Sequence, residues 1–281
     1  MNTEKEFHAL KDFVRETGTI ALKYFDSGNT ENELKRDKTV VTKADQEIEA
    51  ALVGYIQEHF PGDAIVGEEY GEQAGSSGFF WHIDPIDGTD NFLRKIPFFA
   101  ISIARLGDKP EESFAIVYNP AINQMFYSFS ETEGGVYEND RLCTLTPEPL
   151  GGKYVISIGR STKEEWMKPA TYALNEALGT KYGRCGAFNC TALEIAYVAA
   201  NRIDAFLTYG LKSYDWAAGL FLVKATGGAI SVFEEGKWRL WTASLKELCS
   251  QHGRIIFTSH PQIHPDMLGF IGDPAVWAKK T

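Results

Sequence analysis

Hydrophobic positions in the first quarter of the chain recur at the spacing of an amphipathic helix. Residues three or four apart lie on one helical face. The positions concerned are Phe7, Leu10, Val14, Ala21 and Phe25. The polar stretch over residues 26–38 predicts a loop. A second helix is predicted to begin at Thr42 and to stop before Pro61 and Gly62, because proline and glycine interrupt helices.

From about residue 65 to residue 136 the pattern becomes that of β-strands, with short apolar runs separated by turn-forming residues. The clearest runs are 101–106, 114–118 and 125–129. Beyond residue 150, strands alternate with helices, which is typical of an α/β arrangement. Strands are predicted at 154–158, 205–209, 228–233 and 254–258, and helices at 163–178, 191–200 and 215–225.

Two prolines and a glycine pair predict a seam between two subdomains. They are Pro147, Pro149 and Gly151-Gly152. We therefore expect an N-terminal α+β subdomain over residues 1–145 and a C-terminal α/β subdomain over residues 146–281. A chain of 281 residues, 44% of them hydrophobic, can bury a core of that size.

Charge and cysteine usage narrow the function classes. The net charge of −10 argues against a general nucleic-acid binder, which would need a basic surface. The charged first residues do not resemble a signal peptide, and no apolar run approaches the roughly 18 residues that span a bilayer. The four cysteines lack zinc-site spacing. We expect reduced thiols in a cytoplasmic protein that acts without a membrane or nucleic-acid partner.

The segment Trp-His-Ile-Asp-Pro-Ile-Asp-Gly-Thr-Asp-Asn-Phe, residues 81–92, carries the clearest chemical signal. Asp84 and Asp87 flank a proline and follow apolar residues, so they are predicted to lie where a buried strand ends. Two close carboxylates repel each other unless a cation holds them, and Mg²⁺ or Ca²⁺ prefers such oxygen ligands. Free N–H groups at Gly88 and Thr89 suit a phosphate. The alternatives are a solvated turn, or a structural calcium loop that includes Asp90.

Two further acidic segments strengthen the metal interpretation. Glu68 and Glu69 follow a short apolar run, as a buried strand delivering a carboxylate would. Asp215 opens the apolar helix predicted at 215–225. Taken alone, the glutamates are an ordinary exposed pair and Asp215 is a helix cap.

Together the three segments resemble the inositol monophosphatase family, the magnesium-dependent, lithium-sensitive sugar phosphatases. The family pattern is Gly-Glu-Glu, then Asp-Pro-Ile/Leu-Asp-Gly-Thr-x-Asn-Phe, then Trp-Asp-x-Ala-Ala-Gly; here Tyr214 replaces the tryptophan. The resemblance extends to residues 41–45, 97–104 and 225–228. It implies a layered α-β-α-β-α sandwich, two Mg²⁺ ions with a weaker third, and a homodimer.

The resemblance also implies a role for each site residue. Glu68, Asp84 and the Ile86 carbonyl would hold one Mg²⁺, and Asp84, Asp87 and Asp215 a second. Glu68, Thr89 and Asp45 would serve catalysis, with Thr89 paired to Asp45. Asp45 also lies three residues after Thr42, which is the spacing of a capping box. The residues implied to bind substrate are Gly88, Thr89, Asn189, Cys190, Thr191, Thr208 and Asp215.

The expected function is hydrolysis of a small phosphorylated polyol or sugar by a metal-activated water, with inositol monophosphate as the first expected substrate. Residues 188–193 depart from the usual Gly-Ser/Thr-Ala run, and Thr208 stands where some members have an acid. Inositol specificity is therefore open. The alternative substrates are histidinol phosphate, fructose 1,6-bisphosphate, adenosine 3′,5′-bisphosphate and NADP. A further alternative is a regulatory binding protein that retains the fold.

Overall fold

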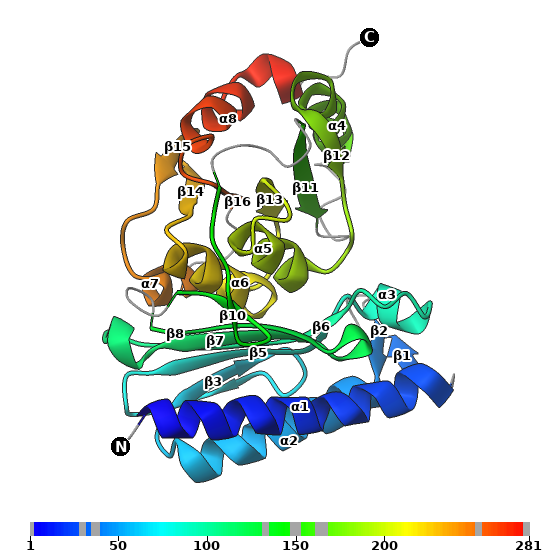
Figure 1. The fold of residues 1–281 in the computed structure, drawn as a ribbon, viewed down its shortest axis with the longest axis vertical. Helices are drawn as coiled ribbons and strands as arrows, with labels where there is room; N and C mark the ends of the chain where they lie inside the picture. Colours follow the sequence, from blue (N-terminus) through cyan, green and yellow to red (C-terminus); the bar gives the residue numbers. More distant parts are fainter. Residues whose placement is uncertain are drawn as a thin grey trace.

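The chain folds into five stacked layers of helices and sheets (Figure 1). The structure, a computed structural model, describes residues 3–27, 32–34, 40–130, 135–146, 153–160, 168–250 and 255–277. Two long helices cover one sheet, a layer of helices separates it from a second sheet, and further helices cover the outer face of the second sheet. The predicted α-β-α-β-α sandwich is confirmed.

The outer N-terminal layer consists of α1 (Thr3–Ser27) and α2 (Lys43–His59), which contact each other. The predicted apolar face of α1 is buried at Phe7, Leu10 and Val14. Thr42 precedes α2 as its N-cap, and its hydroxyl and the Asp45 carboxylate form a capping box. Both predicted helices are confirmed.

An eight-stranded sheet lies against these helices, in the order β10-β9-β8-β7-β6-β5-β3-β4. All neighbours are antiparallel except β3 and β5. The strands are β3 (Ala64–Gly67), β4 (Glu72–Gln73), β5 (Phe80–Asp87), β6 (Ala100–Leu106), β7 (Phe114–Asn119), β8 (Gln124–Phe129), β9 (Tyr137–Glu138) and β10 (Arg141–Leu142). Strands β6, β7 and β8 match the three predicted runs.

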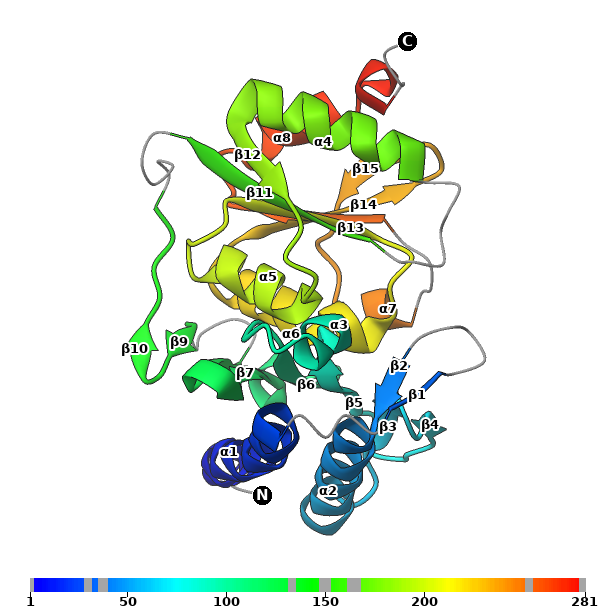
Figure 2. The same cartoon turned by 90° about the vertical axis from the view of Figure 1, so that its right-hand side faces the viewer.

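A layer of helices lies between the two sheets (Figure 2). They are α3 (Thr89–Leu93), α5 (Thr191–Ala199), α6 (Ser213–Ala225) and α7 (Leu245–Cys249). Helix α6 contacts β5, β6 and β7 on one side and β14 and β16 on the other. Because α6 is apolar all round, it is suited to a buried position between two sheets.

A six-stranded mixed sheet follows, in the order β12-β11-β13-β16-β14-β15. Its strands are β11 (Tyr154–Arg160), β12 (Gly183–Gly186), β13 (Ala205–Tyr209), β14 (Ala229–Glu234), β15 (Lys237–Leu240) and β16 (Ile255–Ser259). The outer helices are α4 (Lys168–Tyr182) and α8 (His264–Ile271). Short 3₁₀ turns occur at Pro110–Glu112, Pro120–Ile122 and Pro274–Trp277.

Two expectations need adjustment. The segment 26–38 was expected to be a loop, but Asn32–Leu34 forms strand β1 and pairs with β2 (Val40–Thr42). Such a short ribbon shows no hydrophobic alternation in the sequence. The predicted seam at residues 147–152 lies outside the described residues, and one continuous apolar core joins β6 and β7 to α5, α6 and β13. The division at residue 145 stays a prediction.

Within the described ranges, no helix is long and apolar enough to cross a membrane.

Phe114 is the aromatic centre of the N-terminal core. Its ring lies 5.1 Å from that of Phe7 on α1, 5.4 Å from Trp81 on β5 and 6.1 Å from Phe60 at the end of α2. We expect Phe114→Ala to lower the free energy of unfolding by about 3–5 kcal/mol, because a large cavity would remain among these rings. Urea unfolding measures it. Ile122→Ala, at a side chain that is 53% exposed, should change stability by less than about 0.5 kcal/mol; equal losses would contradict this account.

Candidate metal-dependent active site

Strand β5 carries Asp84 and Asp87 to the middle of the molecule. Asp84 is opposite Ser102 on β6 and Asp87 is opposite Ala100, with a register shift between them. One extra residue on β5 therefore forms a β-bulge, which re-aims a strand locally. Pro85 lies in the bulge, where its missing N–H costs no ladder hydrogen bond. Both carboxylates are buried at the end of a strand, as predicted.

Gly88 makes the turn from β5 into α3. Its φ of 86° is left-handed, and an added Cβ would lie 3.1 Å from both the Asn189 oxygen and the Cys190 Cβ. Glycine is therefore required by both conformation and space. Thr89 is the first residue of α3, and its hydroxyl donates to the Ile86 carbonyl over 3.1 Å.

Asp84 is the electrostatic centre of the site. Its side chain is 2% exposed, and burial raises its pKa well above the ordinary value. Next in size are the charges of Glu68, Asp87, Asp215 and Asp45, which raise its pKa further. The structure therefore brings the carboxylates of Glu68, Asp87, Asp215 and Asp45 close enough to act electrostatically on Asp84. Within the described parts of the chain, the Asp84 Oδ1 atom is buried without a hydrogen-bond partner.

Asp87 and Asp215 are held by backbone donors at helix starts. The Ala192 N–H donates to Asp87 Oδ2 over 2.6 Å, and the Cys190 thiol donates to the same oxygen over 3.2 Å. Burial raises the Asp87 pKa to about 7, and these hydrogen bonds oppose the rise. Asp215 accepts from the Lys212 N–H over 2.6 Å. Cys190, which is predicted to bind substrate, thus contacts Asp87, a predicted metal ligand, directly.

The donor set fits a hard divalent cation in chemistry. It consists of carboxylates around one buried oxygen that lacks a partner, and Mg²⁺ prefers oxygen ligands. As the side chains stand, no group of three or more His, Cys, Asp or Glu residues in the described ranges converges closely enough to hold an ion. Oxygens of Asp87 and Asp215 face the backbone donors named above. Mg²⁺ binding would therefore need the side chains of Asp87 and Asp215 to rotate away from these donors.

The expected pairing of Thr89 with Asp45 is not the arrangement found. Asp45 accepts from the N–H of Thr42 over 2.8 Å and also from the Thr42 hydroxyl, whereas the Thr89 hydroxyl is directed to Ile86. The capping box accounts for this, because Asp45 lies three residues after the Thr42 N-cap. Asp45 is 1% exposed, and burial raises its pKa to about 7.

The predicted substrate-binding residues are split between surface and core. Asn189 is exposed and Thr191, the first residue of α5, is 8% exposed. Thr208 is 1% exposed on β13, and its hydroxyl has no partner within the described residues. Substrate contact by these residues stays a prediction, and for Thr208 it would require its surroundings to open.

Glu49 on α2 is a positioning residue that the sequence pattern did not reveal. It is 0% exposed, and its two carboxylate oxygens accept from the N–H groups of Glu69 and Tyr70, each over 2.9 Å. It also lies over Gly67, where an added Cβ would come within 2.0 Å of the Glu49 Oε1 atom. The turn that presents Glu68 is thus built on Glu49. A charged residue on an otherwise buried helical face was the available signal.

Glu194 on α5 is a second buried glutamate that the sequence pattern did not reveal. It is 0% exposed and accepts from the N–H groups of Phe188 and Cys190, over 2.9 Å and 3.1 Å, and from the Ser157 hydroxyl. It therefore shapes the loop before α5. Asn91 fixes the other side of that loop, because its amide donates to the carbonyls of Phe98 and Phe188, each over 2.8 Å.

His82, two residues before Asp84, is a buried histidine with a hydrogen-bond partner. It is buried, its Nδ1 lies 3.0 Å from the Ser213 hydroxyl, and burial lowers its pKa to about 4. Lys35, a basic residue in the polar stretch 26–38 whose charge could balance the acidic site, lies outside the described residues.

The raised carboxyl pKa values predict pH-dependent stability without divalent metal. The pKa values of Asp45 and Asp87 rise from 3.8 to about 7 on folding. Between these two pH values the native state keeps protons that the unfolded state has lost. The contribution of the two carboxyl groups to stability therefore falls as the pH rises. In EDTA, we expect Asp84→Asn to become progressively more stable than the parent protein between about pH 4 and pH 8.

Urea unfolding at each pH, with and without Mg²⁺, checks this expectation. Excess Mg²⁺ should stabilise the parent protein at the high-pH end and have less effect on the variant. A stability difference that is constant with pH would show that the carboxylates do not share one electrostatic environment.

Glu49→Ala is expected to weaken Mg²⁺ binding about tenfold, as loss of groups that support metal ligands commonly does. The physical reason is that Glu69 and Tyr70 would lose the acceptors that hold the turn next to Glu68. Isothermal titration calorimetry measures the Kd directly. Gln46→Ala, at an exposed position of the same helix, should bind Mg²⁺ like the parent. Equal affinity in all three proteins would remove Glu49 from this role.

Comparisons with known proteins agree with the geometry. A family model described as the inositol monophosphatase family matches residues 3–269. The Nus factor SuhB of Escherichia coli (strain K12) is 34% identical over 237 residues, covering 83% of this chain and 86% of that protein. The inositol-1-monophosphatase of Mesorhizobium japonicum is 33% identical over 215 residues, covering 74% and 78%.

Solved structures show the same architecture. The extragenic suppressor protein suhB from Bartonella henselae superposes with a TM-score of 0.80 at 23% identity, covering 98% of this chain and 99% of that one. The Thermotoga maritima IMPase gives a TM-score of 0.77 at 26% identity, covering 95% and 96%. Because the family model matches residues 3–269 and both named relatives exceed 30% identity, the chain belongs to the inositol monophosphatase family.

Proposed function

We propose that the protein is a Mg²⁺-dependent phosphomonoesterase acting on a small phosphorylated polyol or sugar, with inositol monophosphate as the first expected substrate. The observation that carries the proposal is Asp84, whose carboxylate has a buried, unpartnered oxygen and is subject to the charges of four other carboxylates. A structural calcium loop would not require acids from four separate parts of the chain. Family membership supports the same reading.

The resemblance assigns the ligands as follows. Glu68, Asp84 and the Ile86 carbonyl would hold one Mg²⁺, Asp84, Asp87 and Asp215 a second, and Glu68 would contribute to a weaker third. Bound Mg²⁺ supplies charge neutralisation for the phosphate and lowers the pKa of water. Lithium competition at the second position is part of the proposal.

The protein groups would bind and orient the reactants. The N–H groups of Gly88 and Thr89 would receive the phosphate, because the turn at Gly88 exposes backbone at the start of α3. Thr89 and Asp45 would orient the attacking water, which requires the Thr89 hydroxyl to leave its hydrogen bond with Ile86. Glu68 carries a nearby carboxylate that can share this task, since its charge acts on Asp45.

The leaving group would contact the loop before α5. Asn189 offers an exposed amide there, Cys190 turns its thiol inward to Asp87, and the Phe188 ring is 46% exposed. This mixed polar and aromatic wall suits a sugar and also suits the alternative esters, namely histidinol phosphate, fructose 1,6-bisphosphate, adenosine 3′,5′-bisphosphate and NADP. The family resemblance adds a cytoplasmic homodimer to the proposal.

A regulatory binding role is the second candidate. It is favoured by the name of the similar Escherichia coli protein, Nus factor SuhB, which designates a factor rather than an enzyme. The complete carboxylate set argues that such a role would accompany catalysis and not replace it, because a binding protein has no need to gather four further acids near the buried Asp84.

The decisive experiment is phosphate release with Mg²⁺ from inositol 1-phosphate and the four alternative esters. Asp87→Asn should lower kcat at least about a hundredfold, since it removes a charged metal ligand. Asp12→Asn, an exposed substitution of the same type on α1, is the matched control and should retain full activity. Added Li⁺ should inhibit.

One strongly preferred ester, lost only in Asp87→Asn, would support the enzyme and name its substrate class. Turnover that survives Asp87→Asn would contradict the metal assignment. Folded, Mg²⁺-binding protein that hydrolyses none of the five esters would favour the regulatory candidate.

A further inference from the structure

The Phe188 ring lies exposed beside the turn that is proposed to hold the phosphate. Phe188 is 46% exposed and belongs to the loop before α5. A Cβ added to Gly88 would lie 3.1 Å from the oxygen of the next residue, Asn189, and 3.2 Å from the oxygen of Phe98. The backbone of Phe98 and the loop that carries Phe188 therefore both lie against the Gly88 turn.

Phe98 supports the Phe188 ring from the side of the protein. The two ring centres are 5.6 Å apart, with an angle of 41° between the planes. Phe98 in turn meets Tyr197 edge to face at 5.6 Å, and Tyr197 meets Phe126 on β8 at 5.7 Å. Rings at these separations attract each other. Phe188 is thus the outer end of a row of aromatic side chains that begins in the core.

Two buried polar side chains hold the backbone of Phe188 in place. The Glu194 carboxylate, which is 0% exposed, accepts from the Phe188 N–H over 2.9 Å, and the Asn91 amide donates to the Phe188 carbonyl over 2.8 Å. A buried carboxylate is costly unless it is hydrogen-bonded, and this one serves a loop that carries none of the predicted metal ligands. The position of the ring is therefore fixed before a ligand arrives, which lowers the entropy cost of binding to it.

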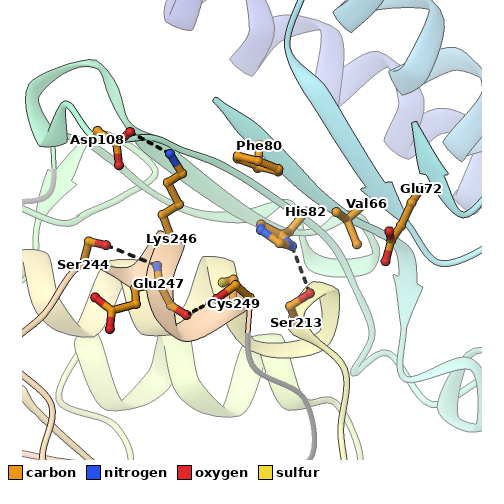
Figure 3. A pocket seen from close by; sticks show the side chains of 11 residues that line it. Val66, Glu72, Phe80, His82, Asp108, Ser213, Ser244, Lys246, Glu247 and Cys249 are labelled. Carbon is orange, nitrogen blue, oxygen red and sulfur yellow. Dashed lines mark hydrogen bonds and ion pairs between the residues drawn. The ribbon is translucent and has the colours of Figure 1, made fainter. Parts of the chain in front are cut away.

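The half-buried Phe80 ring is the alternative place for an aromatic group. It lines a cavity of about 460 Å³ between β5 and α7, together with Val66, His82 and Cys249 (Figure 3). Among the described residues that line this cavity, none belongs to the Gly88 turn or to the loop before α5. An aromatic group there would not share a site with a phosphate at Gly88, so Phe80 provides a matched control for Phe188.

We propose that Phe188 determines substrate specificity, because its ring stacks against an aromatic group on the leaving alcohol while the Gly88 turn holds the phosphate. This inference rests on the proposed function and narrows the preferred substrates to small phosphate monoesters whose alcohol carries an aromatic ring close to the phosphate. Inositol gains less from the contact, since stacking removes water from hydroxyl groups and the Phe188 ring cannot replace it as a hydrogen-bond partner.

Three esters separate aromatic stacking from other contacts, namely benzyl phosphate, cyclohexylmethyl phosphate and inositol 1-phosphate. Phe188→Leu keeps an apolar side chain and removes the aromatic face. With Mg²⁺ present, we expect this variant to raise KM for benzyl phosphate about fivefold, which is within the usual range for an aromatic pair. The value of kcat should be unchanged, because the ring does not contact the reacting atoms. KM for the other two esters should change less than about twofold, since neither presents an aromatic face.

Two further variants test whether the effect belongs to the aromatic ring at this position. Phe188→Tyr keeps an aromatic ring and should keep the KM of the parent protein for benzyl phosphate. Phe80→Leu makes the same substitution as Phe188→Leu in the other cavity (Figure 3), and should leave all three KM values unchanged.

Several outcomes would overturn the role of Phe188. One is an equal change in KM for benzyl phosphate and cyclohexylmethyl phosphate in Phe188→Leu, or no change for either. Another is a rise in KM for benzyl phosphate in Phe80→Leu alone, which would place the aromatic group in the other cavity. A third is a change of oligomeric state in Phe188→Leu, measured by sedimentation, with every KM unchanged, because the ring would then be a contact between copies of the chain.

A binding measurement separates this inference from the proposed function. Phenethylphosphonate resembles benzyl phosphate with a CH₂ group in place of the ester oxygen, so it cannot be hydrolysed. In isothermal titration calorimetry with Mg²⁺, it should bind the parent protein about fivefold more tightly than Phe188→Leu. If it does so but no ester is hydrolysed, the proposed function fails while the binding role of Phe188 stands. Equal affinity for the two proteins would overturn that role, whether or not the esters are hydrolysed.

Discussion

The repulsion among carboxylates around Asp84 is the constraint on which the site depends. Four acids, from β5, α2, α6 and the turn after β3, act on the buried Asp84 carboxylate and raise its pKa. A carboxylate is more stable in water than in the protein interior, so burial adds to the cost of this repulsion. Such a cluster survives folding only because the rest of the protein supplies a large apolar core, directed hydrogen bonds and, on binding, positive charge.

Helix beginnings supply much of the hydrogen bonding. Asp45 is the third residue of α2 and Asp215 the third residue of α6, and each accepts from the backbone N–H just before its helix. Asp87 accepts from Ala192 in the first turn of α5. Three helices thus direct the positive ends of their dipoles towards one acidic region, which offsets part of the repulsion. The layered fold makes this possible, because α5 and α6 lie between the two sheets and α2 lies outside the first.

The difference between what the sequence predicted and what it concealed follows from the range of the interactions. Asp84, Asp87 and Gly88 belong to one short motif, so their strand end, turn and chemistry could be inferred locally, and the periodic helices and strands likewise. Glu49 and Glu194 act on loops 20 and 6 residues away through backbone N–H groups, a relation with no sequence pattern of its own. The bulge in β5 and the Thr42–Asp45 bond, which displaced the expected Thr89–Asp45 pair, depend on register and on helix capping. Resemblance could identify the residues but not choose between competing hydrogen bonds.

Different residues hold the carboxylate cluster and the loop before α5 that is proposed to contact the leaving group. The carboxylate cluster is held by α2, α6 and the Glu49-supported turn, whereas the wall before α5 is held by Glu194 and Asn91. The two systems meet at the Asp87 contact with Cys190 and Ala192. Changes in the wall can therefore alter the substrate while the cluster persists, provided that this contact is kept. Relatives named as a Nus factor and as an inositol-1-monophosphatase are similar to this chain to almost the same degree, 34% and 33%. Overall similarity therefore does not distinguish between these two relatives, whereas the residues of the wall before α5 are where a difference in substrate would be built.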